Sequence, residues 1–311
     1  MKGRILKSTG SFYSVEIDDQ VVTAKLKGKL RLLDQKNTNP VAVGDTVELV
    51  LGKKGEYLIE YVYERKNYLI RRSVNLSKQT HIIASNIDQA LLIVTPVYPE
   101  TSFGFIDRFL VTCEAYSIPA HLILNKSDLF VGEFSELLEG IEYVYHTVGY
   151  PTLRTSALEG TGLDELKTLL KDKISLLSGH SGVGKSSLIN AISPGLNLKT
   201  GQISDYHFKG THTTTFAEMH RLSFGGYIID TPGIKGFGLV DMTPEELSDY
   251  FPEMFRLKAN CRFNNCLHIN EPDCAVRAGV EEGTVPETRY HSYLSMLEEE
   301  KAGPYRVDEY Q

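Results

Sequence analysis

The chain contains no tryptophan, and only four of its 311 residues are cysteines. Four cysteines are too few for the disulfide scaffold of a small secreted domain. No apolar run approaches the roughly 20 residues that a transmembrane helix needs, and the segment around Met1 lacks the apolar core of a secretory signal. We therefore expect a cytoplasmic protein with no membrane partner, and we take it to be a monomer.

The charge of the chain is low in total but uneven along its length. The net charge of −7 argues against indiscriminate binding to nucleic acids. Residues 1–80 nevertheless hold 15 Lys and Arg against 9 Asp and Glu, a net +6, so that the remainder has a net −13. A basic domain on an acidic body suits selective contact with a polyanion. A solvated basic face without any partner explains the same charge equally well.

The first two predicted domains differ in the periodicity of their apolar residues. Residues 1–72 show short alternating patterns such as 11–17, separated by glycines, and predict an OB-type five-stranded β-barrel that binds RNA. In residues 73–240, apolar runs such as 87–94 alternate with helical patterns such as 106–116. That alternation indicates a parallel sheet in a doubly wound α/β domain.

The third predicted domain, residues 241–311, is helical and contains three of the cysteines. Thr243 and Pro244, followed by two glutamates, are typical of the N-cap and first turn of a helix. Residues 289–301 predict a terminal helix.

A phosphate-binding motif occupies residues 179–186, where Gly-x-x-x-x-Gly-Lys-Ser follows an apolar strand and precedes a helical run. Its glycines let backbone N–H groups surround phosphates, and the helix N-terminus adds positive charge. Lys185 would bind the β- and γ-phosphates, and Ser186 would ligate Mg²⁺. A glycine-rich turn without a ligand is the alternative. The predicted nucleotide-binding residues of this loop, which we call the P-loop, are Gly179, His180, Ser181, Gly182, Val183, Gly184, Lys185, Ser186 and Ser187.

A guanine-binding motif follows the predicted strand 121–124. Asp128 can accept two N–H bonds from guanine, and adenine lacks that pair of donors. Asn125 would serve the N7 side of the base and Lys126 its ring face, with Ser127 between them. An Asx-type turn after a strand is the alternative. Further along, Ser156 and Ala157 would supply a backbone N–H to guanine O6.

Two segments have the properties of GTPase switches. Asp230 follows a predicted strand and fits the Walker-B position at Mg²⁺. Gly233, three residues later, could donate its N–H to the γ-phosphate. GTPases also need a threonine that closes over Mg²⁺ and the γ-phosphate. Residues 213–215 are three threonines, of which we take Thr214 as the working candidate; a β-strand of threonines is the alternative.

The residue that orients the attacking water is not evident. Many GTPases place a glutamine directly after the Asp-x-x-Gly motif, but Ile234 occupies that position here. An apolar side chain cannot orient water, so the group must come from elsewhere. His212 is one candidate within the chain, and a partner is another. We expect slow intrinsic hydrolysis that a partner accelerates.

The order of these motifs is unusual, because Asn125–Asp128 precedes the P-loop rather than following it. Neighbours in a sheet need not be neighbours along the chain, and circular permutation at exposed loops is tolerated. We therefore predict a circularly permuted P-loop GTPase domain. In this order the segment after Asp230 leads directly into the third domain, so loss of the γ-phosphate could act on that domain.

The third domain contains a metal-binding pattern. Three thiolates and one imidazole would form a closed tetrahedral site for one structural Zn²⁺. Four protein ligands leave no position for water, which disfavours a zinc enzyme; buried apolar cysteines are the other alternative. The predicted ligands are Cys261, Cys266, His268 and Cys274. Basic and aromatic side chains nearby could face RNA or simply solvent: Arg256, Lys258, Arg262, Phe263 and Arg277.

Taken together, these motifs resemble the circularly permuted bacterial GTPases of the RsgA type, which depend on the small ribosomal subunit. The resemblance covers nearly the whole chain and includes the motif order, the cysteine pattern, the Gly10-Ser11-Phe12 segment and the apolar Ile234. It implies GTP and GDP as ligands, 30S subunits and 16S rRNA as partners, and a role in late 30S maturation. One departure is Thr211, where a basic residue is expected before His212.

Two other classes of function remain open from the residues alone. The first is a nucleotide-gated binding module without a ribosomal role. For such a module, a GTP analogue would give no more co-sedimentation with 30S subunits than GDP does. The second is a P-loop ATPase of another class, which would use ATP and GTP equally.

Overall fold

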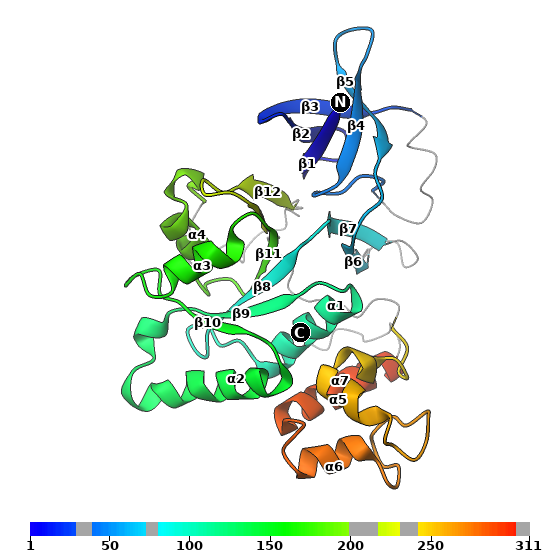
Figure 1. The fold of residues 1–311 in the computed structure, drawn as a ribbon, viewed down its shortest axis with the longest axis vertical. Coiled ribbons are helices and arrows are strands. Elements are labelled where there is room, and N and C mark those ends of the chain that lie inside the picture. The colour runs from blue at the N-terminus through cyan, green and yellow to red at the C-terminus, as the bar shows by residue number, and fades with distance from the viewer. Residues whose placement is uncertain (29–38, 73–79, 199–216, 231–241, 303–311) are drawn as a thin grey trace, which may run out of the picture.

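The computed structural model describes residues 1–28, 39–72, 80–198, 217–230 and 242–302. Three bodies follow one another along the longest axis (Figure 1). A small barrel of strands lies at one end, an α/β layer lies in the middle, and a group of short helices with the C-terminal helix α7 lies at the other end.

The N-terminal body is a closed barrel of β1 (Lys2–Ser8), β2 (Tyr13–Ile17), β3 (Gln20–Leu26), β4 (Thr46–Leu51) and β5 (Tyr57–Val62). The strand order is β1-β2-β3-β5-β4, and β4 pairs back onto β1. Alternate residues such as Tyr13 and Val15 fill the interior. At Gly3 a Cβ atom would lie 2.7 Å from Val15 Cγ1, so a larger residue there would displace side chains of the barrel core. The predicted OB-type barrel is confirmed.

The central body is built on strands in the order β10-β9-β8-β11-β13-β12. All are parallel to their neighbours except β12, which runs antiparallel to β13. The strands are β8 (Gln89–Val94), β9 (Ala120–Leu124), β10 (Thr152–Arg154), β11 (Ile174–Ser178), β12 (Glu218–Arg221) and β13 (Tyr227–Asp230). Every residue of β8 and β11 is buried, as expected for central strands covered on both faces.

Helices cover both faces of this sheet. On one face, α1 (Phe103–Ala115) and α2 (Ser135–Val148) pack on Leu92 and Leu122. On the other, α3 (Leu163–Leu170) and α4 (Lys185–Ile192) pack on Leu91 and Ile123. Neighbouring residues of a strand therefore pack into the two hydrophobic cores on opposite faces of the sheet. Short 3₁₀ helices are η2 (Ser127–Leu129), η3 (Gly132–Phe134) and η4 (Pro194–Leu196). The predicted doubly wound α/β domain is confirmed.

A hairpin of β6 (Tyr68–Arg72) and β7 (Thr80–Ser85) lies between the barrel and the α/β layer (Figure 1). The predicted boundary between residues 72 and 73 falls between its two paired strands, and that boundary stays a prediction. The barrel also touches the α/β sheet edge directly, because β1 pairs with β12 at Lys7 and Glu218. One sheet therefore runs from β10 to the barrel.

The C-terminal body contains η5 (Leu247–Tyr250), α5 (Pro252–Lys258), α6 (Ala275–Glu281) and α7 (Glu287–Ala302). The predicted cap at Thr243 forms, because Leu247 N donates to the Thr243 carbonyl at 3.2 Å and Thr243 N donates to Glu246 Oε2 at 3.1 Å, but the turn continues into the 3₁₀ helix η5 and not into an α-helix. Pro252 disfavours the α conformation at Phe251, whose φ is −111° and ψ is 99°, so a new helix begins at the proline. The terminal helix starts two residues before its predicted start.

Among the residues that the structure describes, none of the helices combines the length and apolar composition that crossing a bilayer requires.

Candidate functional site

The P-loop connects β11 to α4, as its motif requires. Gly179, Gly182 and Gly184 have φ values of +140°, +87° and +95°. A Cβ atom at Gly179 would lie 2.4 Å from the Ile93 carbonyl oxygen, and one at Gly184 would lie 2.4 Å from Asn125 Nδ2. Only glycine fits such positions without displacing the backbone or the buried amide. The loop is therefore shaped by contacts with the ends of β8 and β9.

Lys185 lies across the inside of this loop. Its Nζ donates to the carbonyl oxygens of Gly179 at 2.6 Å and His180 at 2.8 Å. Burial lowers the pKa of Lys185, and the carboxylate of Asp230 opposes that shift. Asp230 is the last residue of β13 and pairs in register with Leu177 of β11. The two neighbouring strands thus bring a cation and a carboxylate to the same edge of the sheet.

The remaining loop residues differ in exposure. Ser181 and Gly182 are exposed on the rim, and Val183 is buried among the residues under α4. Ser186 is half-buried in the first turn of α4, whereas Ser187 is exposed.

The segment 125–128 is tied to the P-loop by a buried amide. Asn125 Nδ2 donates to the Val183 carbonyl at 2.7 Å, and its Oδ1 accepts from Thr155 Oγ1 at 3.1 Å. Asn125 and Thr155 are almost completely inaccessible to solvent. The amide therefore fixes the distance between the end of β9 and the P-loop, and both of its polar atoms have partners.

The loops after β9 and β10 form one unit. Ser127 N donates to the Thr155 carbonyl at 3.0 Å, and Ser156 Oγ donates to Asp128 Oδ1 at 2.5 Å. The serine holds one carboxylate oxygen of Asp128 in place. Ala157, the next residue, packs partly buried against the core under α3.

Two contacts at this edge involve residues that sequence reasoning did not select. Lys126, which has a left-handed φ of 61°, donates from Nζ to the Tyr98 carbonyl at 2.5 Å. The Pro99 ring lies beside Gly182, and a Cβ atom there would be 3.6 Å from Pro99 Cδ. Residues 95–101 follow the C-terminal end of β8, and ligands of such sheets bind at that edge, so topology could have pointed to them.

Other predicted site residues lie outside the residues that the structure describes. These are His212, Thr214 and Gly233, together with Thr211, Ile234 and the threonines beside Thr214.

The C-terminal body brings the four predicted metal ligands together. Their ligand atoms all lie within 4.8 Å of one another. His268 Nδ1 is 3.6 Å from Cys261 Sγ and 3.4 Å from Cys274 Sγ, so this nitrogen faces the sulfurs. Burial raises the pKa of Cys266 to about 12. A thiolate at that position needs a cation beside it, which is the chemistry that a metal supplies.

The loop around the cluster is held by Glu271. Its carboxylate accepts from the backbone N–H groups of Leu267 and Ile269, both at 2.8 Å. Burial by itself would raise the pKa of Glu271, but these backbone N–H donors bring it below its ordinary value. From α7, Tyr290 Oη donates to the His268 carbonyl at 2.6 Å. The cluster is thus fixed from two sides.

Two sequence families match this chain. The RsgA N-terminal domain family matches residues 2–59, and the RsgA GTPase family matches residues 62–240. The chain belongs to the RsgA GTPase family. Like the other members of that family it is a GTPase, and its ligand is a guanine nucleotide. Its motif order and its sheet make it a circularly permuted one.

Similarity to named members of the RsgA family extends over nearly the whole chain. The "Small ribosomal subunit biogenesis GTPase RsgA 2" of Bacteroides thetaiotaomicron is 54% identical over 308 residues, which is 99% of each protein. The "Small ribosomal subunit biogenesis GTPase RsgA" of Flavobacterium johnsoniae is 52% identical over 314 residues, covering 100% of this chain and 96% of the relative.

Two solved structures of the family are also similar. YjeQ from Thermotoga maritima superposes with a TM-score of 0.79 at 38% identity, over 96% of this chain and 97% of that one. "YloQ, a circularly permuted GTPase" superposes with a TM-score of 0.74 at 31% identity, over 98% of this chain and 96% of that one.

Proposed function

We propose that this GTPase is a late maturation factor of the 30S ribosomal subunit, contacts 16S rRNA, and is stimulated by the small subunit. The observation that carries the proposal is the match, over 99% of the chain, to proteins named small ribosomal subunit biogenesis GTPases. We also propose that it acts as a monomer in the cytoplasm.

The nucleotide site supports a division of roles among the chain's own residues. Lys185 would move its ammonium from the loop carbonyls to the β- and γ-phosphates, because a dianionic phosphate is the stronger acceptor. Asp128, held by Ser156, would accept the two N–H groups of guanine. Ser186 and Asp230 would hold Mg²⁺, which would neutralise charge on the phosphates. Thr214, Gly233 and His212 remain the predicted switch and catalytic residues.

The cysteine cluster supports one structural Zn²⁺ per chain. Three sulfurs and His268 Nδ1 converge within 4.8 Å, and all four sites would be protein ligands. The ion would hold the loop 261–274 in one conformation, and Tyr290 and Tyr293 of α7 donate to backbone carbonyls of that loop. Its role is therefore to fix the C-terminal body.

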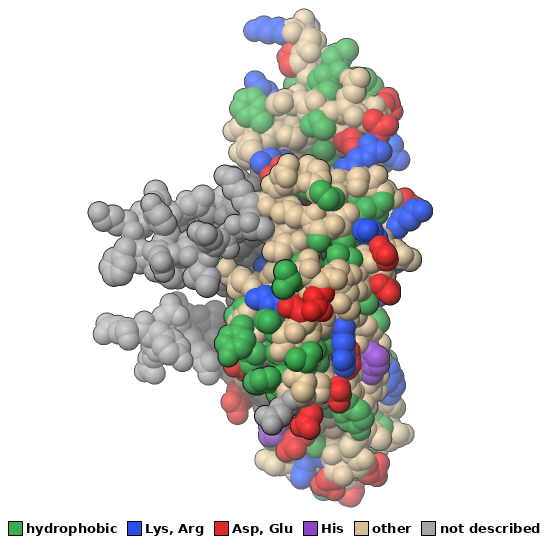
Figure 2. Space-filling view, turned by 90° about the vertical axis from the view of Figure 1, so that its left-hand side faces the viewer, with side chains coloured by type: hydrophobic (Ala, Val, Ile, Leu, Met, Phe, Trp, Pro, Cys, Tyr) green, Lys and Arg blue, Asp and Glu red, His purple; other side chains and the backbone are tan. Residues whose placement is uncertain are grey.

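The barrel supports contact with RNA. Lys25 Nζ lies 5.0 Å from the ring centre of Phe12, and Lys2 Nζ lies 5.1 Å from that of Tyr63. Both rings are exposed, by 47% and 37%. Exposed rings with ammonium groups beside them offer stacking for unpaired bases and charge for the backbone. At the barrel end of one face, basic and apolar side chains lie close together, with acidic side chains among them (Figure 2).

The basic residues near the cysteine cluster support an RNA contact less strongly. Lys258 pairs with Asp249, and Arg262 pairs with Asp273 at 3.0 Å. These two cations are thus already partly neutralised.

The decisive experiment measures GTP hydrolysis with and without purified 30S subunits. We expect slow hydrolysis that 30S subunits accelerate, and weaker acceleration for the Lys25→Ala variant because a barrel contact is lost. Lys171→Ala, at the exposed C-terminal end of α3, is the matched control. No stimulation of the wild type at any salt concentration would contradict the ribosomal role and leave the GTPase assignment intact.

A further inference from the structure

Helix α1 belongs to two hydrophobic cores at once. Ile106, Phe109 and Leu110 pack in the core under one face of the α/β sheet. Val111 packs instead among the residues of the C-terminal body. Arg108 adds an ion pair with Glu299 of α7, at 2.8 Å. The helix is therefore shared between the nucleotide-binding body and the C-terminal body.

The first turn of α1 reaches the P-loop. The Phe105 ring packs against the His180 ring in a tilted arrangement, with centroids 4.0 Å apart and planes inclined by 31°. Ser102 caps the helix by accepting from Phe105 N, which fixes where this ring projects. His180 is the second residue of the P-loop, and its carbonyl oxygen accepts from Lys185 Nζ. Phe105 thus touches the loop that is expected to hold the phosphates.

Two residues later, the same helix is joined to the C-terminal body by buried charges. Asp107 Oδ1 accepts from Arg289 Nη1 at 2.9 Å and from Tyr145 Oη at 2.8 Å. Arg289, from α7, also binds both carboxylate oxygens of Glu253, at 2.7 and 3.0 Å. The side chains of Arg289 and Asp107 are completely buried. A charge buried in this way tolerates little displacement from its partners.

The spacing of the two residues places them on different sides of the helix. Residues two apart in an α-helix are separated by about 200° around its axis. Phe105 can therefore face the P-loop while Asp107 faces α7. A displacement of α7 that moves Asp107 also moves the ring that covers His180, because the two belong to one capped helix.

We propose that the C-terminal body positions the P-loop through helix α1. Phe105 is the positioning residue at the loop, and the Asp107–Arg289 pair anchors the helix to α7. Nucleotide binding at the P-loop and order in α7 are then coupled. The nucleotide site and the C-terminal body are also linked covalently, by the chain after Asp230. The contact through α1 is a second route between them. This coupling requires a nucleotide at the P-loop but no ribosomal partner, so it can fail or hold independently of the role in 30S maturation.

The first test compares nucleotide binding of the wild type and Phe105→Leu, without ribosomes. We expect the affinity for GDP to fall, and KM for GTP to rise, by about fivefold with kcat nearly unchanged, at the low end of measured coupling factors. Phe105→Tyr keeps a ring over His180 and should restore wild-type affinity. Tyr57→Leu also replaces a partly buried ring by leucine, but in the barrel core, and should leave affinity unchanged.

The second test measures amide hydrogen exchange in α7 of the full-length protein, with and without GDP. Coupling is reciprocal, so GDP should slow exchange in wild-type α7 and should do so much less in Phe105→Leu. Unchanged exchange in the wild type overturns the proposal. Equal slowing in Phe105→Leu also overturns it, because the signal would then travel by the other route. The proposal is likewise overturned if Phe105→Leu binds GDP as tightly as the wild type does.

Discussion

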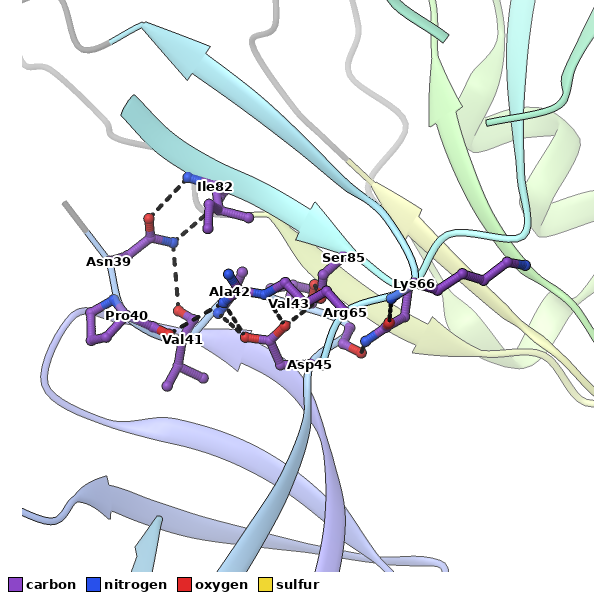
Figure 3. A network of polar contacts seen from close by, with 12 residues as sticks. Asn39, Pro40, Val41, Ala42, Val43, Asp45, Arg65, Lys66, Ile82 and Ser85 are labelled. Carbon is purple, nitrogen blue, oxygen red and sulfur yellow. Dashed lines mark hydrogen bonds and ion pairs between the residues drawn. The ribbon is translucent and has the colours of Figure 1, made fainter. Parts of the chain in front are cut away.

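A buried aspartate and an arginine join the barrel to the β6–β7 hairpin, and another such pair joins the C-terminal body to α1, but the two joints differ in their surroundings. At the barrel, Asp45 accepts four hydrogen bonds, from Ala42 N, Ser85 Oγ and two nitrogens of Arg65, at 2.6–2.8 Å (Figure 3). The Arg65 side chain keeps 18% of its surface exposed. The Asp45 carboxylate is therefore surrounded by protein donors, whereas the Arg65 guanidinium can also be hydrated.

The backbone reinforces the barrel joint. Ser85 N donates to the Val43 carbonyl at 2.9 Å, and Asn86 Nδ2 donates to the Gly44 carbonyl at 3.0 Å. Asn39 exchanges two hydrogen bonds with the backbone of Ile82, as Figure 3 also shows. A Cβ atom at Gly44 would lie 2.1 Å from the Ser85 carbonyl oxygen, so the two backbones touch. Loss of one side chain leaves most of this joint in place.

Among the residues that the structure describes, the charges of the C-terminal joint have no such reserve of backbone contacts around them. Arg289 is completely buried between two carboxylates and beneath aromatic rings, the nearest being Phe251 at 4.7 Å. Burial raises the pKa of Asp107, although Arg289 acts in the opposite direction. The comparison teaches that the barrel joint is built to be rigid, whereas the C-terminal joint is stable only while its set of charges is complete.

The largest effect is expected from Arg289→Met. It leaves Asp107 and Glu253 buried without their cation, and such a loss costs about 3–5 kcal/mol of the free energy of unfolding. Urea denaturation followed by circular dichroism measures it. A triple variant in which Asp107 and Glu253 also become leucine should recover much of that loss, since a whole buried ionic set can be replaced by apolar packing. A single variant as stable as the wild type would remove the contrast between the joints.

A smaller effect is expected from Asp45→Asn at the barrel. The amide turns one acceptor into a donor that faces other donors, which costs about 1–3 kcal/mol. Arg65 can turn towards water, so this cost should stay below that of Arg289→Met in the same denaturation experiment. Asp164→Asn is the control, because the side chain of Asp164 is 93% exposed beside Lys167. A larger loss for Asp45→Asn than for Arg289→Met would reverse the comparison.

Features of the fold could be predicted from sequence where their signal lies in neighbouring residues of the chain. The strand before Asn125 and the strand that ends in Asp230 were predicted because an apolar run stops at a motif residue. The convergence of the cysteine cluster follows from close spacing along the chain.

Most of what sequence reasoning missed depends on distant partners. The strand β12 is short and mostly polar, and it is a strand because it pairs with β13 and with Lys7 of the barrel. Helix α2 contains Gly140, which weakens its helical signal. Arg289 was predicted only as the start of the terminal helix; its pair with Asp107 spans 182 positions and has no local signature.

The smallest effect is expected where the barrel meets the sheet edge, from Lys7→Ala. Lys7 Nζ lies 2.7 Å from Glu218 Oε2, but both side chains are about two-fifths exposed, at 39% and 40%. Exposed pairs of this kind contribute about 0.5 kcal/mol or less, because water and salt screen them. Denaturation at low and at high salt should therefore show a small difference from the wild type that vanishes at high salt. If the variant loses as much stability as Asp45→Asn, independently of salt, then the strand pairing between β1 and β12 is a third joint of the same rank, and the barrel is held to the sheet edge as firmly as to the hairpin.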